Sequence, residues 1–225
     1  MKSWIIPPKQ SADFVYHMEN VLAVYERPYD ERFPVVCVDE SPKQLIGITQ
    51  YRSADGTRIE DSEYIRHGVG EIYMAFEPLA GQRFVEVKDD HKAITWVGVL
   101  AGLLDGPYAK CLKMTVVGDN LSAHKPSAFY TVFGAEKAKS YLDRLEFVYT
   151  PKHGSCGPPL RLDMAEIELS ILQRDCLNRH IATKALLVAE ISAWQTKRNA
   201  KHAKANWQFT AKDARIKLHK LYPAT

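Results

Sequence analysis

Two stretches of sequence decide the fold: Val35-Val36-Cys37-Val38-Asp39-Glu40 and Thr115-Val116-Val117-Gly118-Asp119-Asn120. In each, a continuous run of apolar, mostly β-branched residues ends abruptly at an aspartate. Short apolar runs without polar alternation are typical of strands that are buried on both faces of a sheet. We therefore expect two neighbouring central strands that bring Asp39 and Asp119 together at one edge of the sheet. Two carboxylates held that close need a proton or a cation between them, which suggests a divalent metal site.

The surrounding patterns indicate a mixed sheet flanked by helices. Antiparallel strands are expected at 33–38, 45–49, 71–76 and 84–87, with 51–70 as a long loop. Apolar residues at helical spacing predict a helix over 91–104 before the buried strand 111–117, and a helical crossover makes that strand parallel to the first. The remaining patterns predict a Ser11-capped helix, helices at 125–133, 135–142, 162–178, 183–198 and 210–221, and a strand at 145–149.

This order of elements describes an α/β protein with a ribonuclease-H-like fold, in which the first and fourth strands are neighbours. We expect a lead-in segment with one helix at 1–32, a catalytic domain at 33–180 and a basic helical extension at 181–225. The chain has 225 residues, of which 46% are hydrophobic and 25% charged, as in ordinary globular proteins. No apolar run is long enough to span a bilayer, so a cytoplasmic location is expected.

Cysteines and charges narrow the kinds of site. The four cysteines are scattered without a Cys-x-x-Cys pair, which disfavours a structural zinc or a disulfide framework, and we expect Cys37, Cys111 and Cys176 to be buried. Between Lys197 and Lys220 lie eight Lys or Arg residues and one acid, whereas the rest of the chain has 22 basic and 26 acidic residues. A basic tail on a mildly acidic body is expected of a protein that holds a polyanion, although a solvated helical face gives the same pattern.

A third carboxylate is needed to complete a pair of metal ions. The sequence Asp163-Met164-Ala165-Glu166-Ile167-Glu168 offers candidates at the start of a long helix. With Met164, Ile167 and Ile171 on the buried side, Glu166 is the first choice and Glu168 the reserve. Three carboxylates around two divalent ions suit phosphodiester chemistry, because one ion activates the attacking oxygen while the other stabilises the leaving oxygen. Oxygen ligands favour Mg²⁺ or Mn²⁺ over zinc.

Several motifs together resemble those of DDE transposases, in the bacterial insertion-sequence branch of the mariner superfamily. They include the two strand ends with Lys43 and His124, and the helix start Met164-Ala-Glu166-Ile-Glu168. The resemblance also rests on Arg27-Pro-Tyr29-Asp, Phe76-Glu77-Pro-Leu-Ala80-Gly81, Tyr149-Thr-Pro151-Lys152-His153-Gly154-Ser155 and Trp207-Gln-Phe209-Thr-Ala-Lys-Asp213-Ala-Arg215-Ile-Lys217-Leu. Nearly the whole chain is similar to the catalytic half of that family.

The resemblance implies an enzyme that uses two Mg²⁺ or Mn²⁺ ions to cut DNA at the ends of a mobile element and to join the freed 3′-hydroxyl to a target. Asp39, Asp119 and Glu166 would bind the metal. Double-stranded DNA is the implied partner, and a homodimer and a separately encoded helix-turn-helix portion are further partners that this interpretation allows. The residues expected to contact DNA are Asn120, His124, Lys152, His153, Lys197, Arg198, Lys201, Lys204, Arg215 and Lys217.

The sequence departs from the family pattern in two places. After Ser155, the segment Cys156–Asp163 is longer than in relatives and lacks their tryptophan, and its Gly-Pro-Pro turn predicts a bulge just before Glu166. Since a 1 Å error at a catalytic group can cost about a hundredfold in rate, we expect impaired activity. Only 32 residues precede Phe33, so the helix-turn-helix modules of relatives are expected to be missing. The alternative function is that of an inactive remnant that binds DNA without cutting it.

Overall fold

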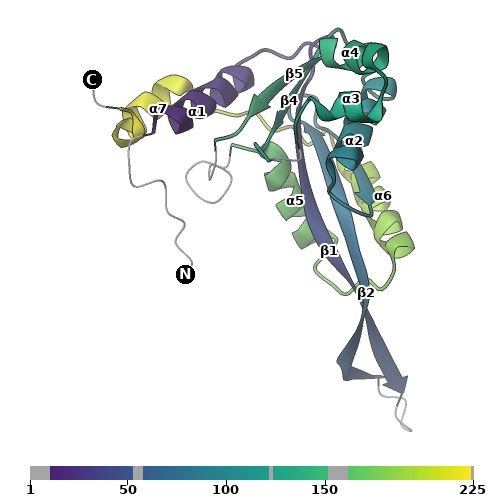
Figure 1. The fold of residues 1–225 in the computed structure, drawn as a ribbon. Helices are drawn as coiled ribbons and strands as arrows, with labels where there is room; N and C mark the ends of the chain where they lie inside the picture. The colour runs from purple at the N-terminus through teal and green to yellow at the C-terminus, as the bar shows by residue number, and fades with distance from the viewer. Residues whose placement is uncertain (1–10, 53–57, 122–123, 152–161, 224–225) are drawn as a thin grey trace.

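The computed structural model describes residues 11–52, 58–121, 124–151 and 162–223, with the side chains of 49–52 and 58–63 left out. Figure 1 shows a mixed sheet with helices packed against both faces. The strands are β1 (Val35–Arg52), β2 (Arg58–Glu77), β3 (Gln82–Lys88), β4 (Met114–Gly118) and β5 (Leu145–Tyr149). The helices are α1 (Ala12–Tyr25), α2 (Ala93–Asp105), α3 (Ala128–Val132), α4 (Ala135–Asp143), α5 (Met164–Asp175), α6 (Lys184–Ala200) and α7 (Ala211–Lys217), followed by the 3-10 turn η1 (His219–Leu221).

The sheet has the strand order β3-β2-β1-β4-β5. The strands β1, β2 and β3 form an antiparallel meander, and β4 lies parallel to β1 and to β5. The helical crossover through α2 therefore brings the fourth strand beside the first, as the order of elements predicts. The predicted fold class, a ribonuclease-H-like mixed sheet with helices at the C-terminus, is confirmed.

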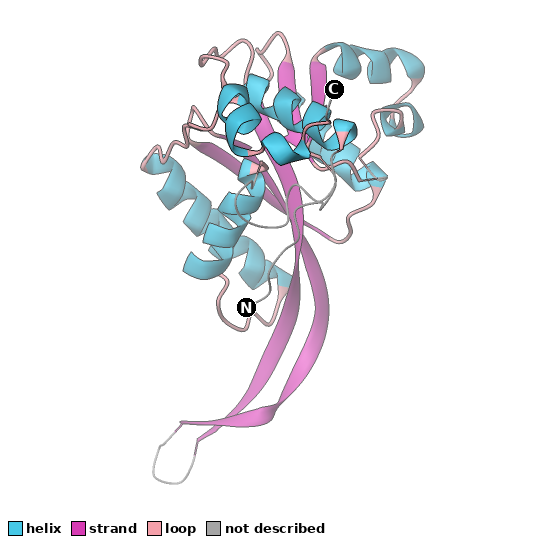
Figure 2. Ribbon diagram, turned by 90° about the vertical axis from the view of Figure 1, so that its left-hand side faces the viewer, coloured by secondary structure: helices cyan, strands magenta, loops and turns pink. Residues whose placement is uncertain are grey.

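One sequence prediction about the sheet is wrong. The predicted strands 33–38 and 45–49 are parts of one strand, β1, and most of the predicted loop 51–70 belongs to β2. The two strands pair antiparallel out to Arg52 and Arg58, with irregularities in register between Gln44 and Ile46 and between Ile48 and Gln50. Their outer parts form a two-stranded ribbon that extends beyond the body of the molecule, as Figures 1 and 2 show.

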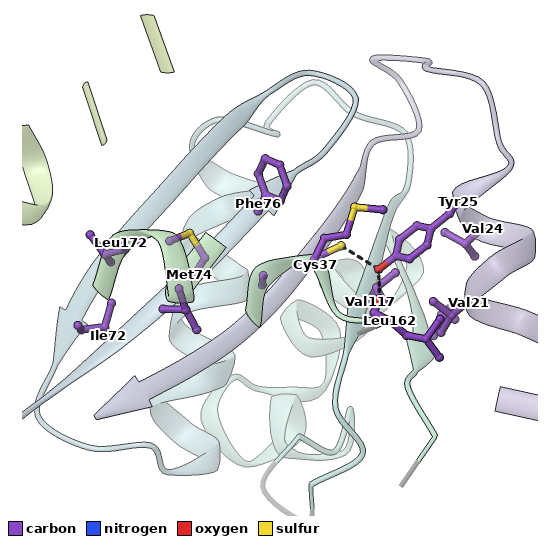
Figure 3. Packing of buried hydrophobic residues seen from close by; sticks show 14 of the residues in the cluster. Val21, Val24, Tyr25, Cys37, Ile72, Met74, Phe76, Val117, Leu162 and Leu172 are labelled. Atoms are coloured by element: carbon purple, nitrogen blue, oxygen red, sulfur yellow. Dashed lines mark hydrogen bonds between the residues drawn. The ribbon is translucent and has the colours of Figure 1, made fainter. Parts of the chain in front are cut away.

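Side chains of the central strands alternate between two apolar layers, as the period of two in a strand requires. In β1, Val36 and Val38 pack with α2 and α4 on one face, whereas Cys37 packs with α1 and α5 on the other. The second layer also contains residues of α6, α7 and η1, so the C-terminal helices contribute to this core. Figure 3 shows Tyr25 of α1 reaching across this layer to donate a hydrogen bond to the carbonyl oxygen of Leu162 at 2.5 Å.

Side chains cap several of the helices, including the first at Ser11, as predicted. The Ser11 hydroxyl accepts from the amide of Phe14, and Thr210 forms a reciprocal capping box with Asp213 at the start of α7. The predicted burial of Cys37 and Cys111 is confirmed, Cys176 is only half-buried, and Cys156 lies outside the described residues. Within the described part of the chain, no helix is long and apolar enough to cross a membrane.

Gly118 allows β4 to approach β1 closely. A Cβ atom at this position would lie 3.0 Å from the carbonyl oxygen of Val38. We expect Gly118→Ala to lower the free energy of unfolding by about 1–3 kcal/mol, because backbone atoms must move apart to accept the methyl group. Urea denaturation measures this change.

Gly98→Ala is the matched control. Gly98 lies inside α2 on its exposed side, and nothing lies within 4 Å of an added Cβ. This substitution should raise the free energy of unfolding by about 0.5–1 kcal/mol, because alanine favours the helix. Equal effects of the two substitutions would contradict the assigned approach of β4 to β1.

Candidate active site

The register of β1 and β4 places Asp39 and Asp119 at the same level of the sheet. Parallel pairing ends with Cys37 opposite Val117, and each aspartate follows two residues later. Asp39 does not end its strand, because β1 continues toward the ribbon, but it lies just past the last position paired with β4. Asp119 follows Gly118, the last residue of β4. The predicted proximity of the two strand positions is therefore present.

Helix α5 supplies further carboxylates on the same face of the sheet. Strand alternation places Asp39 on the face of Cys37, and α5 packs against this face across β1 and β2. The helix begins after Asp163, whose Oδ1 accepts a hydrogen bond of 2.8 Å from the amide of Ala165. Glu166 lies in the first turn and is half-buried. The site therefore collects side chains from two neighbouring strands and one helix N-terminus.

The carboxylates at this site interact strongly. The pKa of Asp39 is raised to about 7, mainly by burial and further by the charges of Glu40, Asp119 and Glu166, while the hydrogen bond from the amide of Glu40 partly offsets the rise. Burial also raises the pKa of Asp163, which is 1% exposed, and the charge of Asp39 adds to that effect. Such repulsion between carboxylates in a protein interior is relieved by protonation or by a cation.

His124 already supplies one positive charge to this cluster. Its Nδ1 lies 2.6 Å from Oδ1 of Asp119, and its Nε2 lies 3.3 Å from Oε2 of Glu40. Burial alone would lower the pKa of His124, but its interactions with Asp119 and Glu40 raise that pKa to about 10. The ring stacks on buried Trp96 of α2, with centroids 5.1 Å apart and planes 17° apart. A protonated His124 therefore links Glu40 of β1 to Asp119, which follows β4.

Glu168, the reserve candidate, lies elsewhere. Its two oxygens accept hydrogen bonds from Arg83 and Arg198, and the side chain is almost fully buried. The predicted buried side of this helix is wrong in part, because Ile167 and Ile171 are only half-buried. The residues of α5 that are buried are Met164, Ala165, Glu168, Leu169 and Leu172.

The residues expected to contact DNA have different surroundings. Asn120, Lys197, Lys201, Lys204 and Lys217 are exposed, whereas His124 is 4% exposed and faces the carboxylates. The guanidinium of Arg198 is paired with Glu168, and that of Arg215 with Glu19, each through two hydrogen bonds. Lys152 and His153 lie outside the described residues, as does most of the predicted bulge at 156–163.

The side chains at the site fit a divalent cation in their chemistry. They are carboxylates, the ligands that Mg²⁺ and Mn²⁺ prefer, and Oδ2 of Asp163 is buried without a hydrogen-bond partner among the described residues. The residues described do not include three or more His, Cys, Asp or Glu side chains already arranged to hold a metal ion. The donors therefore have the right chemistry and lie in one region, but they are not gathered into a finished coordination sphere.

Three residues lie at this site without a role predicted from the sequence: Glu40, Asp163 and Trp96. Glu40 follows Asp39 and, by strand alternation, faces α2, where it meets His124. Asp163 is recognisable as a helix-capping residue, but its burial beside Asp39 is a tertiary effect. For Trp96, the sequence predicts only that it belongs to an amphipathic helix. The signal for Glu40 was available, since it adjoins a predicted ligand on a buried strand.

The chain resembles known proteins both in sequence, through a family model, and in structure. A family model described as DDE superfamily endonuclease matches residues 34–187. The chain is similar to the Mos1 transposase paired-end complex with left transposon end, with 11% identity and a TM-score of 0.54 over 90% of this chain and 62% of that one. It is also similar to the Mos1 mariner paired end complex with Mn, with 12% identity and a TM-score of 0.51 over 90% of this chain and 62% of that one.

A third similar structure is the mariner Mos1 paired end complex with Mg, with 9% identity and a TM-score of 0.53 over 100% of this chain and 67% of that one. At these identities the likeness shows a common fold. The chain spans about three fifths of the length of the first of these structures. No curated protein sequence matches the chain.

Replacing His124 tests its role between Glu40 and Asp119. We expect His124→Ala to lower the free energy of unfolding at pH 6 by about 1–3 kcal/mol, because two carboxylates lose their buried partner. The raised pKa of His124 means that this stabilisation is fully present below about pH 6.5 and is lost as pH rises toward about 10. Urea denaturation across this range measures the difference between the two proteins.

His219→Ala is the control, because His219 is exposed on η1. It should change the free energy of unfolding by less than about 0.5 kcal/mol at every pH. A difference between wild type and His124→Ala that stays constant from pH 6 to pH 10 would show that the charge of His124 is not what stabilises the site.

Proposed function

The protein belongs to the DDE superfamily of endonucleases, whose family model covers residues 34–187, and from that premise we propose that it is a transposase catalytic domain that cuts and joins DNA. The bonds broken would be phosphodiesters at the ends of a mobile element. The freed 3′-hydroxyl would then attack a phosphodiester of target DNA. Asp39, Asp119 and Glu166 are the proposed metal ligands in both steps.

The observation that carries this proposal is the electrostatic coupling of carboxylates from three separate elements. The pKa of Asp39 is raised first by burial and then by the charges around it, which include Asp119 and Glu166. Folding keeps these groups together despite their repulsion, which is a common property of functional sites. Glu166 thus acts on Asp39 despite the bulge that the sequence predicts before α5. This supports Glu166 over Glu168 as the third ligand.

Each side chain at the site has a proposed task. When bound, two Mg²⁺ or Mn²⁺ ions would supply Lewis acidity to the attacking oxygen and neutralise charge on the leaving oxygen. Asp39 and Asp119 provide the central oxygen ligands, and Glu166 approaches from the helix. His124 holds Asp119 by a hydrogen bond and, through Glu40, limits the separation of the two strands. Asp163 fixes the start of the helix that carries Glu166.

Contact with DNA is proposed for the exposed lysines near the C-terminus. The side chains of Lys197, Lys201 and Lys204 are exposed at the end of α6 and in the segment that follows it. One of the similar solved structures is a transposase complex with a transposon end, which supports double-stranded DNA as the partner. The proposal extends to a homodimer, and to a separately encoded helix-turn-helix portion that recognises the element ends.

A cleavage assay tests the enzymatic proposal. The wild-type chain, incubated with Mn²⁺ and supercoiled or end-bearing DNA, should nick phosphodiesters and leave 3′-hydroxyl ends. Asp39→Ala should reduce nicking to the level without protein, because the site loses a central ligand. Gel analysis with end labelling gives both the rate and the end chemistry.

Asp143→Ala is the control, since Asp143 is an exposed carboxylate paired with Lys139 on α4. It should nick DNA at the wild-type rate. Bound DNA without Mn²⁺-dependent nicking by the wild-type chain would instead support the alternative, a remnant that binds DNA without cutting it.

Salt dependence tests the proposed DNA contacts. The affinity for a short DNA duplex should fall as salt rises, with a slope of about −0.9 in log units for each phosphate contact. The double variant Lys201→Ala and Lys204→Ala should reduce this slope by about 2, because two cations are removed. Fluorescence anisotropy at several salt concentrations measures both slopes.

Arg215→Ala provides the comparison, since the guanidinium of Arg215 is engaged by Glu19. Its slope should match that of the wild type. A slope that is unchanged in the double variant but reduced by Arg215→Ala would place the contact on α7 instead of after α6.

A further inference from the structure

Glu168 is a buried carboxylate that the proposed chemistry does not use. It is 3% exposed, and each of its two oxygens accepts hydrogen bonds from both Arg83 and Arg198. The oxygen Oε2 lies 2.9 Å from Nε of Arg83 and 2.7 Å from Nε of Arg198. The oxygen Oε1 lies 2.9 Å from Nη2 of Arg83 and 2.8 Å from Nη2 of Arg198. Two planar guanidinium groups therefore hold one carboxylate in a defined orientation.

Arg83 is itself fixed on all sides. It comes from β3 and is fully buried, with its guanidinium 4.3 Å from the ring centroid of Phe76. Its remaining donors reach two carbonyl oxygens, that of Gly81 at 2.7 Å and that of Ala203 at 2.5 Å. Because its five N–H groups have few alternative partners, its orientation is set by the fold and not by Glu168 alone.

Arg198 is carried by α6, which is attached to the edge of the sheet. The side chain of Asn199 accepts a hydrogen bond of 2.9 Å from the amide of Arg83 and donates one of 2.8 Å to the carbonyl of Arg83. Gln195 accepts a hydrogen bond of 2.7 Å from the amide of Val85. These two side chains take the place of a neighbouring strand along β3, so α6 covers that edge. Arg198 therefore reaches α5 from a helix whose position along β3 is fixed by these hydrogen bonds.

Glu168 and Glu166 point away from each other on α5. Two residues of an α-helix correspond to a rotation of about 200°, so one side chain faces the arginines while the other faces Asp39 and Asp119. Any rotation of α5 about its axis moves both carboxylates together. A buried ion cluster adds little net stability over an apolar one, but it is strongly directional. The cluster therefore suits the control of orientation better than the gain of stability.

We propose that Glu168, Arg83 and Arg198 are positioning residues that fix the rotation of α5 and thereby aim the carboxylate of Glu166 at Asp39 and Asp119. This inference rests on the proposed role of Glu166 as a metal ligand. It assigns Arg198 to the support of the site and not to DNA. It also gives α6 a function. Arg198 of this helix holds Glu168 and thereby supports Glu166, the proposed third metal ligand.

Arg198→Ala is the decisive variant, since Arg198 is partly accessible and its loss leaves Arg83 to pair with Glu168. In the metal-free protein, the amides of α5 should exchange with deuterium about 10-fold faster, because the helix is held less firmly. The affinity for Mn²⁺, measured by calorimetry on the full chain, should fall by about 10–100-fold, as for loss of an outer-shell partner of a metal ligand. Arg198→Lys keeps the charge but not the two-pronged geometry, and should recover only part of this affinity.

Two comparisons separate this role from simpler ones. Lys184, like Arg198, belongs to α6, and Lys184→Ala removes its exposed ion pair with Asp89. This substitution should leave both the amide exchange of α5 and the affinity for Mn²⁺ unchanged. If Arg198 bound DNA directly, Arg198→Ala would weaken duplex binding and reduce its salt slope by about 1 while leaving Mn²⁺ affinity intact. That result would overturn the proposal.

The failure of the positioning role and the failure of the proposed function give different results. Wild-type chain that binds Mn²⁺ no better than Asp39→Ala would overturn the metal site, and the positioning role with it. Wild-type chain that binds Mn²⁺, together with an Arg198→Ala variant of equal Mn²⁺ affinity and equal α5 exchange, would overturn the positioning role alone. A lower melting temperature of Arg198→Ala, with both of those readouts unchanged, would show a purely structural role.

Discussion

The structure depends on the parallel pairing of β1 with β4, which is only three residues long. Val35, Val36 and Cys37 pair with Thr115, Val116 and Val117, and the strands then diverge. The pairing is buried on both sides by apolar layers, so its register is determined by packing. Each strand therefore delivers its aspartate to the same level, and everything else at the site is arranged around that pair of charges.

The carboxylates in and near the site differ in how their negative charge is compensated. His124 provides a positive charge to Asp119 and Glu40, and Trp96 holds its ring in place. At Asp39 no such partner is seen among the described residues, and its pKa is raised to about 7, first by burial and then by neighbouring carboxylates. Glu168 of α5 is paired with Arg83 and Arg198, on the side of the helix away from the proposed metal site. Asp39, whose pKa is raised in this way, lies where the proposed metal ions would bind.

The sequence predicted the parts of the fold that depend on local apolar pattern. Apolar runs predict the buried strand segments that carry Asp39 and precede Asp119, and their parallel arrangement. Helical periodicity and capping residues predict the helices. The outer ribbon of β1 and β2 did not, because the stretch 51–70 is polar and glycine-bearing in sequence, whereas the described parts of the ribbon are joined by antiparallel pairing. The burial of Glu168 was also unpredictable locally, since its partners lie 85 and 30 residues away.

The central claim is that Asp39 and Asp119 together bind a divalent cation that acts on DNA. The most direct test is a crystal of the chain soaked in Mn²⁺, with the anomalous signal of manganese used to locate the ion. The account predicts a strong peak between the carboxylates of Asp39 and Asp119, within coordination distance of both and on the side that faces Glu166. Absence of a peak there at saturating Mn²⁺, or a peak only at other carboxylates, would contradict it.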